Sequence, residues 1–136
     1  MMTIPSKAQL ETIAKRYGLR LIVLFGSQVI GRTHPESDVD VAVWTARPLT
    51  SAWRTRLWME LSDAFQMEID LAVLNQAEPL LLSQVARKGK LLYENKRWAW
   101  EEFKGYAFRY FEDTQKYRDD LTRYLKRELQ GTPRAG

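Results

Sequence analysis

Three aspartates and a glycine–serine pair are the residues of this sequence whose types and spacing could do chemistry. Ten residues separate Gly26-Ser27 from Asp38, Asp40 follows two positions later, and Asp70 interrupts a later apolar run. Carboxylate oxygens are ligands that Mg²⁺ prefers, and glycine lets the backbone approach a phosphate closely. Such a set could hold a triphosphate, neutralise its charge and place the attacking and leaving oxygens in line. The combination points to nucleotidyl transfer.

Each candidate has a role in such a reaction. Ser27 offers a hydroxyl and a backbone N–H at the start of a short helical turn, which suits the terminal phosphates. Asp38 and Asp40 lie two positions apart on an expected strand, so their side chains share one face and can converge on Mg²⁺. Asp70 could complete the site of the metal that binds the acceptor oxygen, or take the acceptor's proton. Three carboxylates repel one another without a cation, which favours bound metal.

Each motif also has an ordinary explanation. A Gly-Ser pair after a strand is usually a turn, and two acids at a strand end are commonly just solvated. Asp70 alone could be a charge that protects an edge strand from aggregation. The joint occurrence of all three features at strand ends of one small domain favours the catalytic interpretation.

The elements expected to position these residues alternate between helices and strands. Apolar residues three and four apart indicate helices, and short runs of branched or alternating residues indicate strands. The expected order is a helix over 7–17, a strand over 19–25, a loop after residue 31, a strand over 38–44, a helix from 50 or 51 to about 65, a strand over 68–74, a helix over 79–86, a strand over 90–93 and a long helix from 97. This order predicts an α/β (α+β) domain.

The last expected helix is unusually long. Apolar side chains step by three and four from Phe103 to Leu129, which indicates one stripe along one helix. A helix of about thirty residues reaches roughly 45 Å, longer than a small domain is wide, so part of it should pack against a partner. We therefore divide the chain into a catalytic core over 1–96, a helical extension of the same domain over 97–130 and a disordered tail over 131–136.

Length and composition limit the functions open to the chain. Its 136 residues suffice for one compact domain. The sequence has no cysteine, which excludes disulfides and thiolate metal sites, and no stretch fits a signal peptide or a membrane span. We therefore expect a cytoplasmic protein. The net charge of +4 is modest, and no segment remains to clamp a duplex, so nucleic acid is not an expected partner.

A family resemblance rests on two segments of the chain. Residues 24–44 (LFGSQVIGRTHPESDVDVAVW) and 68–74 (EIDLAVL) resemble the signature of the DNA polymerase beta-like nucleotidyltransferases, and the resemblance extends over about 19–93. It implies a mixed sheet flanked by helices, with ATP as substrate and two Mg²⁺ ions. The resemblance also implies that Gly26 and Ser27 bind the nucleotide. It implies that the metal ligands are Asp38, Asp40 and Asp70.

The phosphate-binding loop departs from the family pattern at one position. Many members read G-S-x-A-R-G, whereas Ile30 stands at the arginine position here. Arg32, two residues further on, is the cation expected to contact phosphate in its place. All three carboxylates are present, so we expect an active enzyme.

Size and layout resemble the minimal nucleotidyltransferases (MNT) that are paired with HEPN-domain toxins. This resemblance implies an antitoxin that transfers AMP from ATP to a tyrosine hydroxyl of its cognate HEPN toxin, in a hetero-oligomer with that toxin. Two alternatives stay open. The acceptor could be a small hydroxylated molecule such as an antibiotic, although the chain is short for that function. The protein could also be a non-catalytic antitoxin that only binds its toxin, which the departure at Ile30 would suit.

Overall fold

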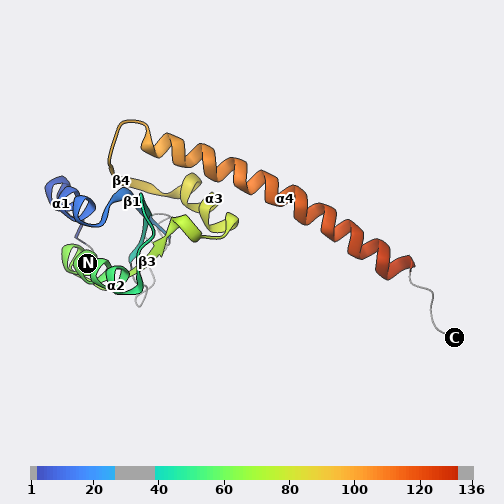
Figure 1. The fold of residues 1–136 in the computed structure, drawn as a ribbon, viewed down its shortest axis with the longest axis horizontal. Coiled ribbons are helices and arrows are strands. Elements are labelled where there is room, and N and C mark those ends of the chain that lie inside the picture. The colour runs from blue at the N-terminus through green and yellow to red at the C-terminus, as the bar shows by residue number, and fades with distance from the viewer. Residues whose placement is uncertain (1–2, 27–38, 132–136) are drawn as a thin grey trace.

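A computed structural model describes residues 3–26 and 39–131 of the chain. Within these ranges the helices and strands follow one another in the predicted order (Figure 1). They are α1 (Lys7–Tyr17), β1 (Leu19–Phe25), β2 (Val39–Thr45), α2 (Ser51–Phe65), β3 (Ile69–Val73), the short 3₁₀ helix η1 (Leu74–Gln76), α3 (Pro79–Lys88), β4 (Lys90–Glu94) and α4 (Ala99–Gly131). The observed ends differ from the expected ones by at most two residues, and the short helix η1 was not predicted. The helical turn expected from Ser27 lies outside the described ranges.

Local signals at the helix ends explain why these segments stop and start where they do. Ser6 and Gln9 form a reciprocal capping box at the start of α1, and Gly18 ends that helix in the left-handed conformation, with φ of 66°. The Thr50 side chain accepts a hydrogen bond from the Trp53 backbone N–H and so caps α2. Pro79 opens α3, where a missing N–H costs nothing.

The four strands form one mixed sheet in the order β3-β2-β1-β4. β1 pairs antiparallel with both β2 and β4, whereas β2 and β3 run parallel. A parallel pair needs a crossover connection, and α2 provides it. The mixed sheet flanked by helices that the family resemblance implied is therefore confirmed.

Side chains of the two central strands alternate between two cores, one on each face of the sheet. Ile22 and Val41 pack with residues of α1 and α2, which cover what we call the α1–α2 face. Leu21, Val23 and Ala42 pack with residues of α3 and α4 on the opposite side, the α3–α4 face. Figure 1 shows the two pairs of helices on either side of the sheet. The chain thus forms three layers, with the sheet in the middle.

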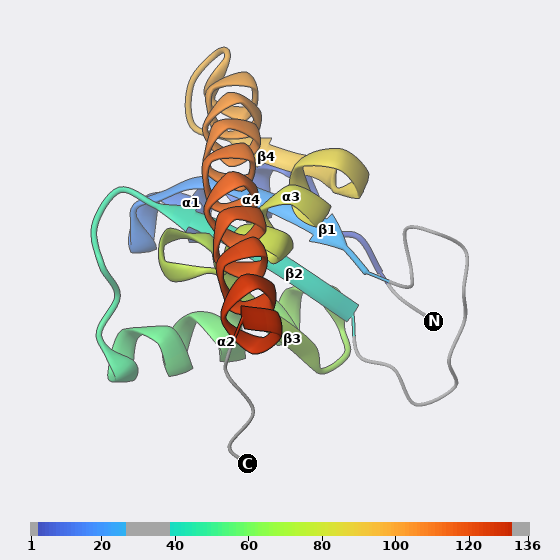
Figure 2. The ribbon, with the colours of Figure 1, turned by 90° about the vertical axis from the view of Figure 1, so that its right-hand side faces the viewer.

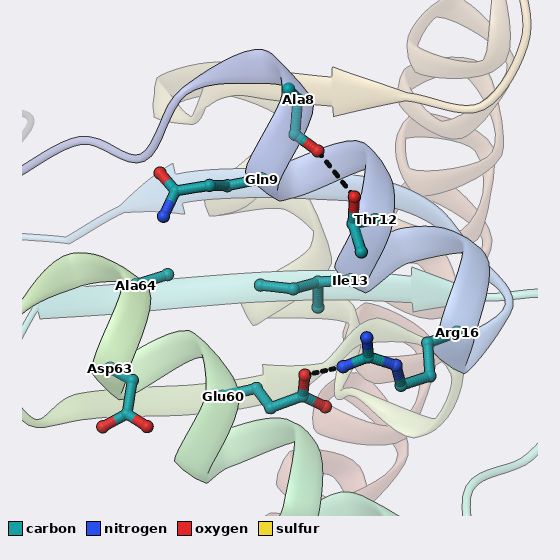
Figure 3. A pocket seen from close by; sticks show the side chains of 8 residues that line it. All are labelled: Ala8, Gln9, Thr12, Ile13, Arg16, Glu60, Asp63 and Ala64. Carbon is teal, nitrogen blue, oxygen red and sulfur yellow. Dashed lines mark hydrogen bonds and ion pairs between the residues drawn. The ribbon is translucent and has the colours of Figure 1, made fainter.

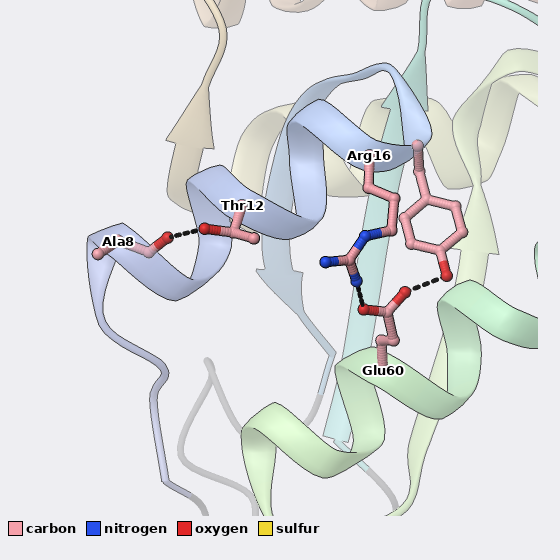
Figure 4. Close-up of polar contacts among 5 residues, drawn as sticks. Ala8, Thr12, Arg16 and Glu60 are labelled. Carbon is pink, nitrogen blue, oxygen red and sulfur yellow. Dashed lines mark hydrogen bonds and ion pairs between the residues drawn. The ribbon is translucent and has the colours of Figure 1, made fainter.

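One carboxylate joins the two helices of the α1–α2 face. Glu60 of α2 accepts hydrogen bonds from the Arg16 guanidinium and the Tyr17 hydroxyl at the end of α1 (Figure 4). Tyr17 also packs edge-on against Trp53, with 5.5 Å between the ring centroids. Burial, and then the bond to Glu60, raises the pKa of Tyr17 to about 12. The phenol therefore stays protonated at neutral pH and remains a donor to Glu60.

The helix α4 extends far beyond the layered body. Its 33 residues reach about 50 Å at 1.5 Å per residue. Ala99, Phe103 and Ala107 are its buried residues, and the described side chains after Ala107 are half-buried or exposed. Figure 1 shows the second half of α4 projecting away from the body. The predicted long C-terminal helix is therefore confirmed. None of the described helices is long and apolar enough to cross a membrane.

Candidate active site

Two of the three predicted carboxylates lie side by side at one end of the sheet. In the parallel pair of β2 and β3, Asp40 is the register partner of Asp70, and Phe25 at the end of β1 is the partner of Asp40. Neighbouring strands are about 4.8 Å apart, so both carboxylates project from adjacent positions on the same face. Asp40 is half-buried and Asp70 is exposed. The structure therefore brings together two acids that are thirty positions apart in the sequence.

Alternation along the strands identifies the face that carries these acids. Ala42 and Ala72, two positions after Asp40 and Asp70, pack in the core of the α3–α4 face. Side chains two positions apart on a strand point the same way. Asp40 and Asp70 therefore belong to the α3–α4 face, at the end of the sheet where β1 stops and β2 begins (Figure 2).

Gly26 lies directly against the Asp40 carboxylate. A Cβ added at this position would be 2.7 Å from Cγ of Asp40 and closer still to its Oδ2, so no side chain fits there. The backbone of Gly26 also has φ of +88°, which other residues rarely adopt. The sequence predicted this glycine for close approach to phosphate, and the structure adds a second reason that the sequence did not reveal. Gly26 leaves room for the carboxylate at position 40.

Three of the predicted site residues lie outside the described ranges. They are Ser27, Arg32 and Asp38, so their places in the site stay predictions. Among the residues that are described, no group of three His, Cys, Asp or Glu side chains could hold a metal ion. The donor set that is described nevertheless suits Mg²⁺, because Asp40 and Asp70 supply hard oxygen ligands from adjacent strands, and Gly26 leaves space beside Asp40.

A row of α2 side chains holds the edge of β3 on both sides of Asp70. Trp58 Nε1 donates to the Ile69 carbonyl at 2.7 Å, and Arg54 Nη2 donates to the Leu71 carbonyl at 3.2 Å. Ser62 Oγ accepts from the Ile69 N–H at 3.3 Å. In the sheet formed by the described residues β3 is an edge strand, so these backbone groups have no neighbouring strand to pair with. The side chains of α2 therefore supply the hydrogen-bond partners that a fifth strand would otherwise provide.

Sequence reasoning missed this row of side chains. It placed these residues on the expected helix that ends near 65, but it predicted no contact between that helix and a strand. The available signal was the four-residue spacing of these three polar side chains, which puts them on one side of a helix. Nothing in that spacing indicates which strand they reach. A hollow of about 260 Å³ lies beside the row, lined by side chains that include Thr55, Trp58 and Asp70.

A larger pocket lies away from the carboxylates. It measures about 480 Å³ and is found between α1 and α2, where Arg16, Glu60 and Asp63 contribute to its wall (Figure 3). This pocket belongs to the α1–α2 face, whereas Asp40 and Asp70 belong to the α3–α4 face. Because the sheet separates the two, we do not include this pocket in the candidate site.

Similarity to known proteins agrees with this geometry. The model of the family described as polymerase beta, nucleotidyltransferase, matches residues 8–97 of the chain. The chain is 40% identical over 75 residues to the protein adenylyltransferase MntA of Shewanella oneidensis. That alignment covers 55% of this chain and 54% of the relative, which is about half of each protein.

Solved structures with a similar fold come from toxin–antitoxin complexes. One is a toxin–antitoxin crystal structure with AMP-PNP, with a TM-score of 0.72 and 28% identity over 89% of this chain and 98% of that one. Another holds the tri-AMPylated HEPN toxin of Shewanella oneidensis in complex with MNT antitoxin, with a TM-score of 0.66 and 26% identity over 88% of this chain and 95% of that one. Both the sequence motifs and the fold assign the chain to one family. The protein belongs to the polymerase beta nucleotidyltransferase family.

Proposed function

We propose that this protein is an antitoxin that transfers AMP from ATP to a tyrosine hydroxyl of a cognate HEPN toxin. The observation that carries the proposal is the pair Asp40 and Asp70, placed side by side at the strand ends of a nucleotidyltransferase fold, with Gly26 against Asp40. The similarity to an adenylyltransferase and to a complex with a tri-AMPylated toxin supports AMP as the group and a HEPN toxin as the acceptor. The similarity to a complex with AMP-PNP supports ATP as the donor.

The reaction exchanges one phosphorus–oxygen bond for another. The acceptor hydroxyl oxygen forms a bond to the α-phosphorus of ATP, and the bond from that phosphorus to the bridging oxygen breaks, so pyrophosphate leaves with the electron pair. We assign Asp70 to taking the hydroxyl proton or to holding a metal near the acceptor, and its exposed position beside Asp40 supports this assignment. Magnesium held by Asp38, Asp40 and Asp70 would neutralise the charge that develops on the phosphate oxygens.

The phosphate-binding residues complete this proposal. Gly26 allows the chain to turn beside Asp40, and Ser27 follows it directly, so we assign the terminal phosphates to the Ser27 hydroxyl and N–H. We assign Arg32 to a phosphate oxygen, in place of the family arginine at position 30. Residues 1–96 then form the catalytic core, and 97–130 form its helical extension.

The compartment is part of the same proposal. The sequence has no cysteine, and none of the described helices could cross a membrane. A chain without cysteine suits a reducing compartment, and the proposed reaction needs a compartment that contains ATP. We therefore propose that the reaction takes place in the cytoplasm, within a hetero-oligomer of this protein and its toxin.

Intact mass spectrometry tests the proposed transfer. The purified protein is incubated with the HEPN toxin, Mg²⁺ and ATP, and the toxin is expected to gain the mass of one or more AMP groups. Asp40→Asn and Asp70→Asn should each reduce this gain by at least about 100-fold, because each removes a charged oxygen at the site of transfer. Asp63→Asn is the matched control, since Asp63 is an exposed aspartate of α2 on the other face of the sheet.

The same assay separates the proposal from its alternatives. If the toxin gains no mass although it forms a stable complex and is neutralised, the protein acts by binding alone. If Asp40→Asn still neutralises the toxin, binding is again the mechanism. If only a small hydroxylated molecule gains AMP, the acceptor is not the toxin.

A further inference from the structure

The second half of α4 carries an apolar stripe that nothing in the described chain covers. We define the α4 stripe as Tyr110, Tyr117, Leu121, Tyr124 and Leu125, whose side chains are between 41 and 69% exposed. Large apolar side chains of a small domain are usually placed in its core, and a contiguous exposed set marks an interaction site. Tyrosine is also enriched among residues that dominate binding energy.

The α4 stripe continues the face of the helix that packs on the body. Phe103 and Ala107 are fully buried in the core of the α3–α4 face. From Ala107, steps of three and four lead through Tyr110 and Thr114 to Tyr117 and Leu121. Residues at this spacing share one side of a helix. The stripe therefore points to the side on which the body lies, although the helix has already left the body (Figure 1).

The stripe and the carboxylates face the same side of the molecule. The core that receives Phe103 also contains Ala42 and Ala72, and Asp40 and Asp70 share the face of these two alanines. Figure 2 looks onto this face and shows α4 passing in front of the sheet. A molecule held against the α4 stripe would therefore lie next to the face on which transfer is proposed.

We propose that the α4 stripe is the docking surface for the protein whose hydroxyl receives the nucleotidyl group. This inference rests on the function proposed above, with the toxin as that protein. The hollow beside Asp70, about 260 Å³, can take a side chain but not a protein. A protein acceptor must therefore be held by contacts elsewhere, and the stripe provides apolar and aromatic contacts on the required face. Its partner surface should be apolar in the middle and charged at the rim.

The area of the stripe favours this occupant over a second copy of the chain. The exposed half of α4 is about 36 Å long and about 12 Å wide, which offers roughly 430 Å². A stable interface buries about 800 Å² on each partner. Two copies paired through their stripes alone would bury only about half of that area. An acceptor protein that contacts both the stripe and the carboxylate end of the sheet can bury the area that a stable interface needs.

A pair of variants tests the docking surface. Tyr117→Ala/Leu121→Ala removes the middle of the stripe, and Phe108→Ala is the control, because Phe108 is an exposed apolar residue of α4 outside the stripe. Calorimetric titration with the HEPN toxin, without nucleotide, should give a Kd at least about tenfold higher for the stripe variant. AMP transfer should show a similar rise in KM for the toxin, with kcat within about twofold. The control should match the unmodified protein in both assays.

Each other result has a defined meaning. If the stripe variant binds the toxin as tightly as the unmodified protein, the inference is wrong. If sedimentation shows a dimer that the stripe variant abolishes while toxin binding is unchanged, the occupant is a second copy and the inference is again wrong. If the stripe variant loses binding but the unmodified protein transfers no AMP to the toxin, the docking surface stands and the proposed transfer fails.

Discussion

Gly26 lies against the Asp40 carboxylate, so a side chain at position 26 would displace that carboxylate. Gly26→Ala would push a Cβ into the Asp40 carboxylate and also strain a backbone with φ of +88°. We expect a loss of about 1–2 kcal/mol in the free energy of unfolding from the strained backbone. We expect a larger effect on AMP transfer, a fall in kcat of roughly 100-fold, because the carboxylate must move. Chemical denaturation and the mass assay measure the two effects.

Gly18 provides the control for this substitution. Its φ is +66°, but a Cβ there would meet no atom within 4 Å. Gly18→Ala should therefore cost about 1 kcal/mol of stability and leave transfer unchanged. Equal losses of activity in the two variants would show that backbone strain, and not displacement of Asp40, is responsible.

Tyr17 makes stability depend on pH at the alkaline end. Its pKa in the folded protein is about 12, above the ordinary value of 10. Below pH 10 the phenol is protonated in both states, so its contribution to stability is fully present. Between about pH 10 and 12 the unfolded chain loses this proton more readily than the folded one, so the contribution is lost. The free energy of unfolding of Tyr17→Phe should therefore fall less between pH 9 and 11.5 than that of the unmodified protein. Urea unfolding of both proteins at these two pH values measures the difference. Parallel declines in the two proteins would contradict the assignment.

At the scale of elements, side chains of α2 bond to the backbone of β3 on both sides of Asp70. Trp58→Phe keeps an aromatic ring but removes the N–H that binds the Ile69 carbonyl, next to Asp70. We expect a loss of about 1 kcal/mol in stability. Because β3 then has a less fixed position, we also expect a fall of roughly tenfold in kcat and weaker Mn²⁺ binding. Trp53→Phe makes the same chemical change on the same helix, where the ring packs against Tyr17 instead.

The two tryptophan variants separate positioning from folding. If both lower stability but only Trp58→Phe lowers kcat and Mn²⁺ affinity, the bond to β3 positions Asp70. If Trp58→Phe loses stability and retains full activity, the bond is structural alone. Titration with Mn²⁺ by paramagnetic resonance gives the metal affinity independently of turnover.

For the whole molecule, our proposals assign AMP transfer to the body and toxin binding to the projecting half of α4. The buried residues of α4 lie between Ala99 and Ala107, and the described side chains from Gln115 to Gln130 are exposed. A chain that ends after Thr114 should keep its Tm within about 4 °C, because it loses no buried contact. It should still bind ATP, but its affinity for the toxin should fall at least about tenfold. A large drop in Tm, measured by calorimetry, would show instead that the projecting half stabilises the body.

Much of the fold could be predicted because its signals are local. The helix spacing around Leu10 and Ile13, the branched run of β1 and the apolar steps of α4 are properties of neighbouring residues, and each gave the element that is observed. The helix ends followed from caps such as Ser6 and Gly18. The alternation of Asp40 with valines also predicted that this acid shares a face with other even-numbered residues of its strand.

The candidate site could be predicted only in part. The sequence by itself determined which residues are proposed to carry the chemistry, because the types and spacing of Gly26, Asp40 and Asp70 can be read without a structure. Only the tertiary structure decided that Asp40 and Asp70 are register partners, that Gly26 abuts a carboxylate, and that Trp58 holds the neighbouring carbonyl. These contacts join elements that are far apart in the chain, and they depend on strand order and helix placement. Local spacing encodes the elements, whereas burial of both faces of the sheet selects how they pack.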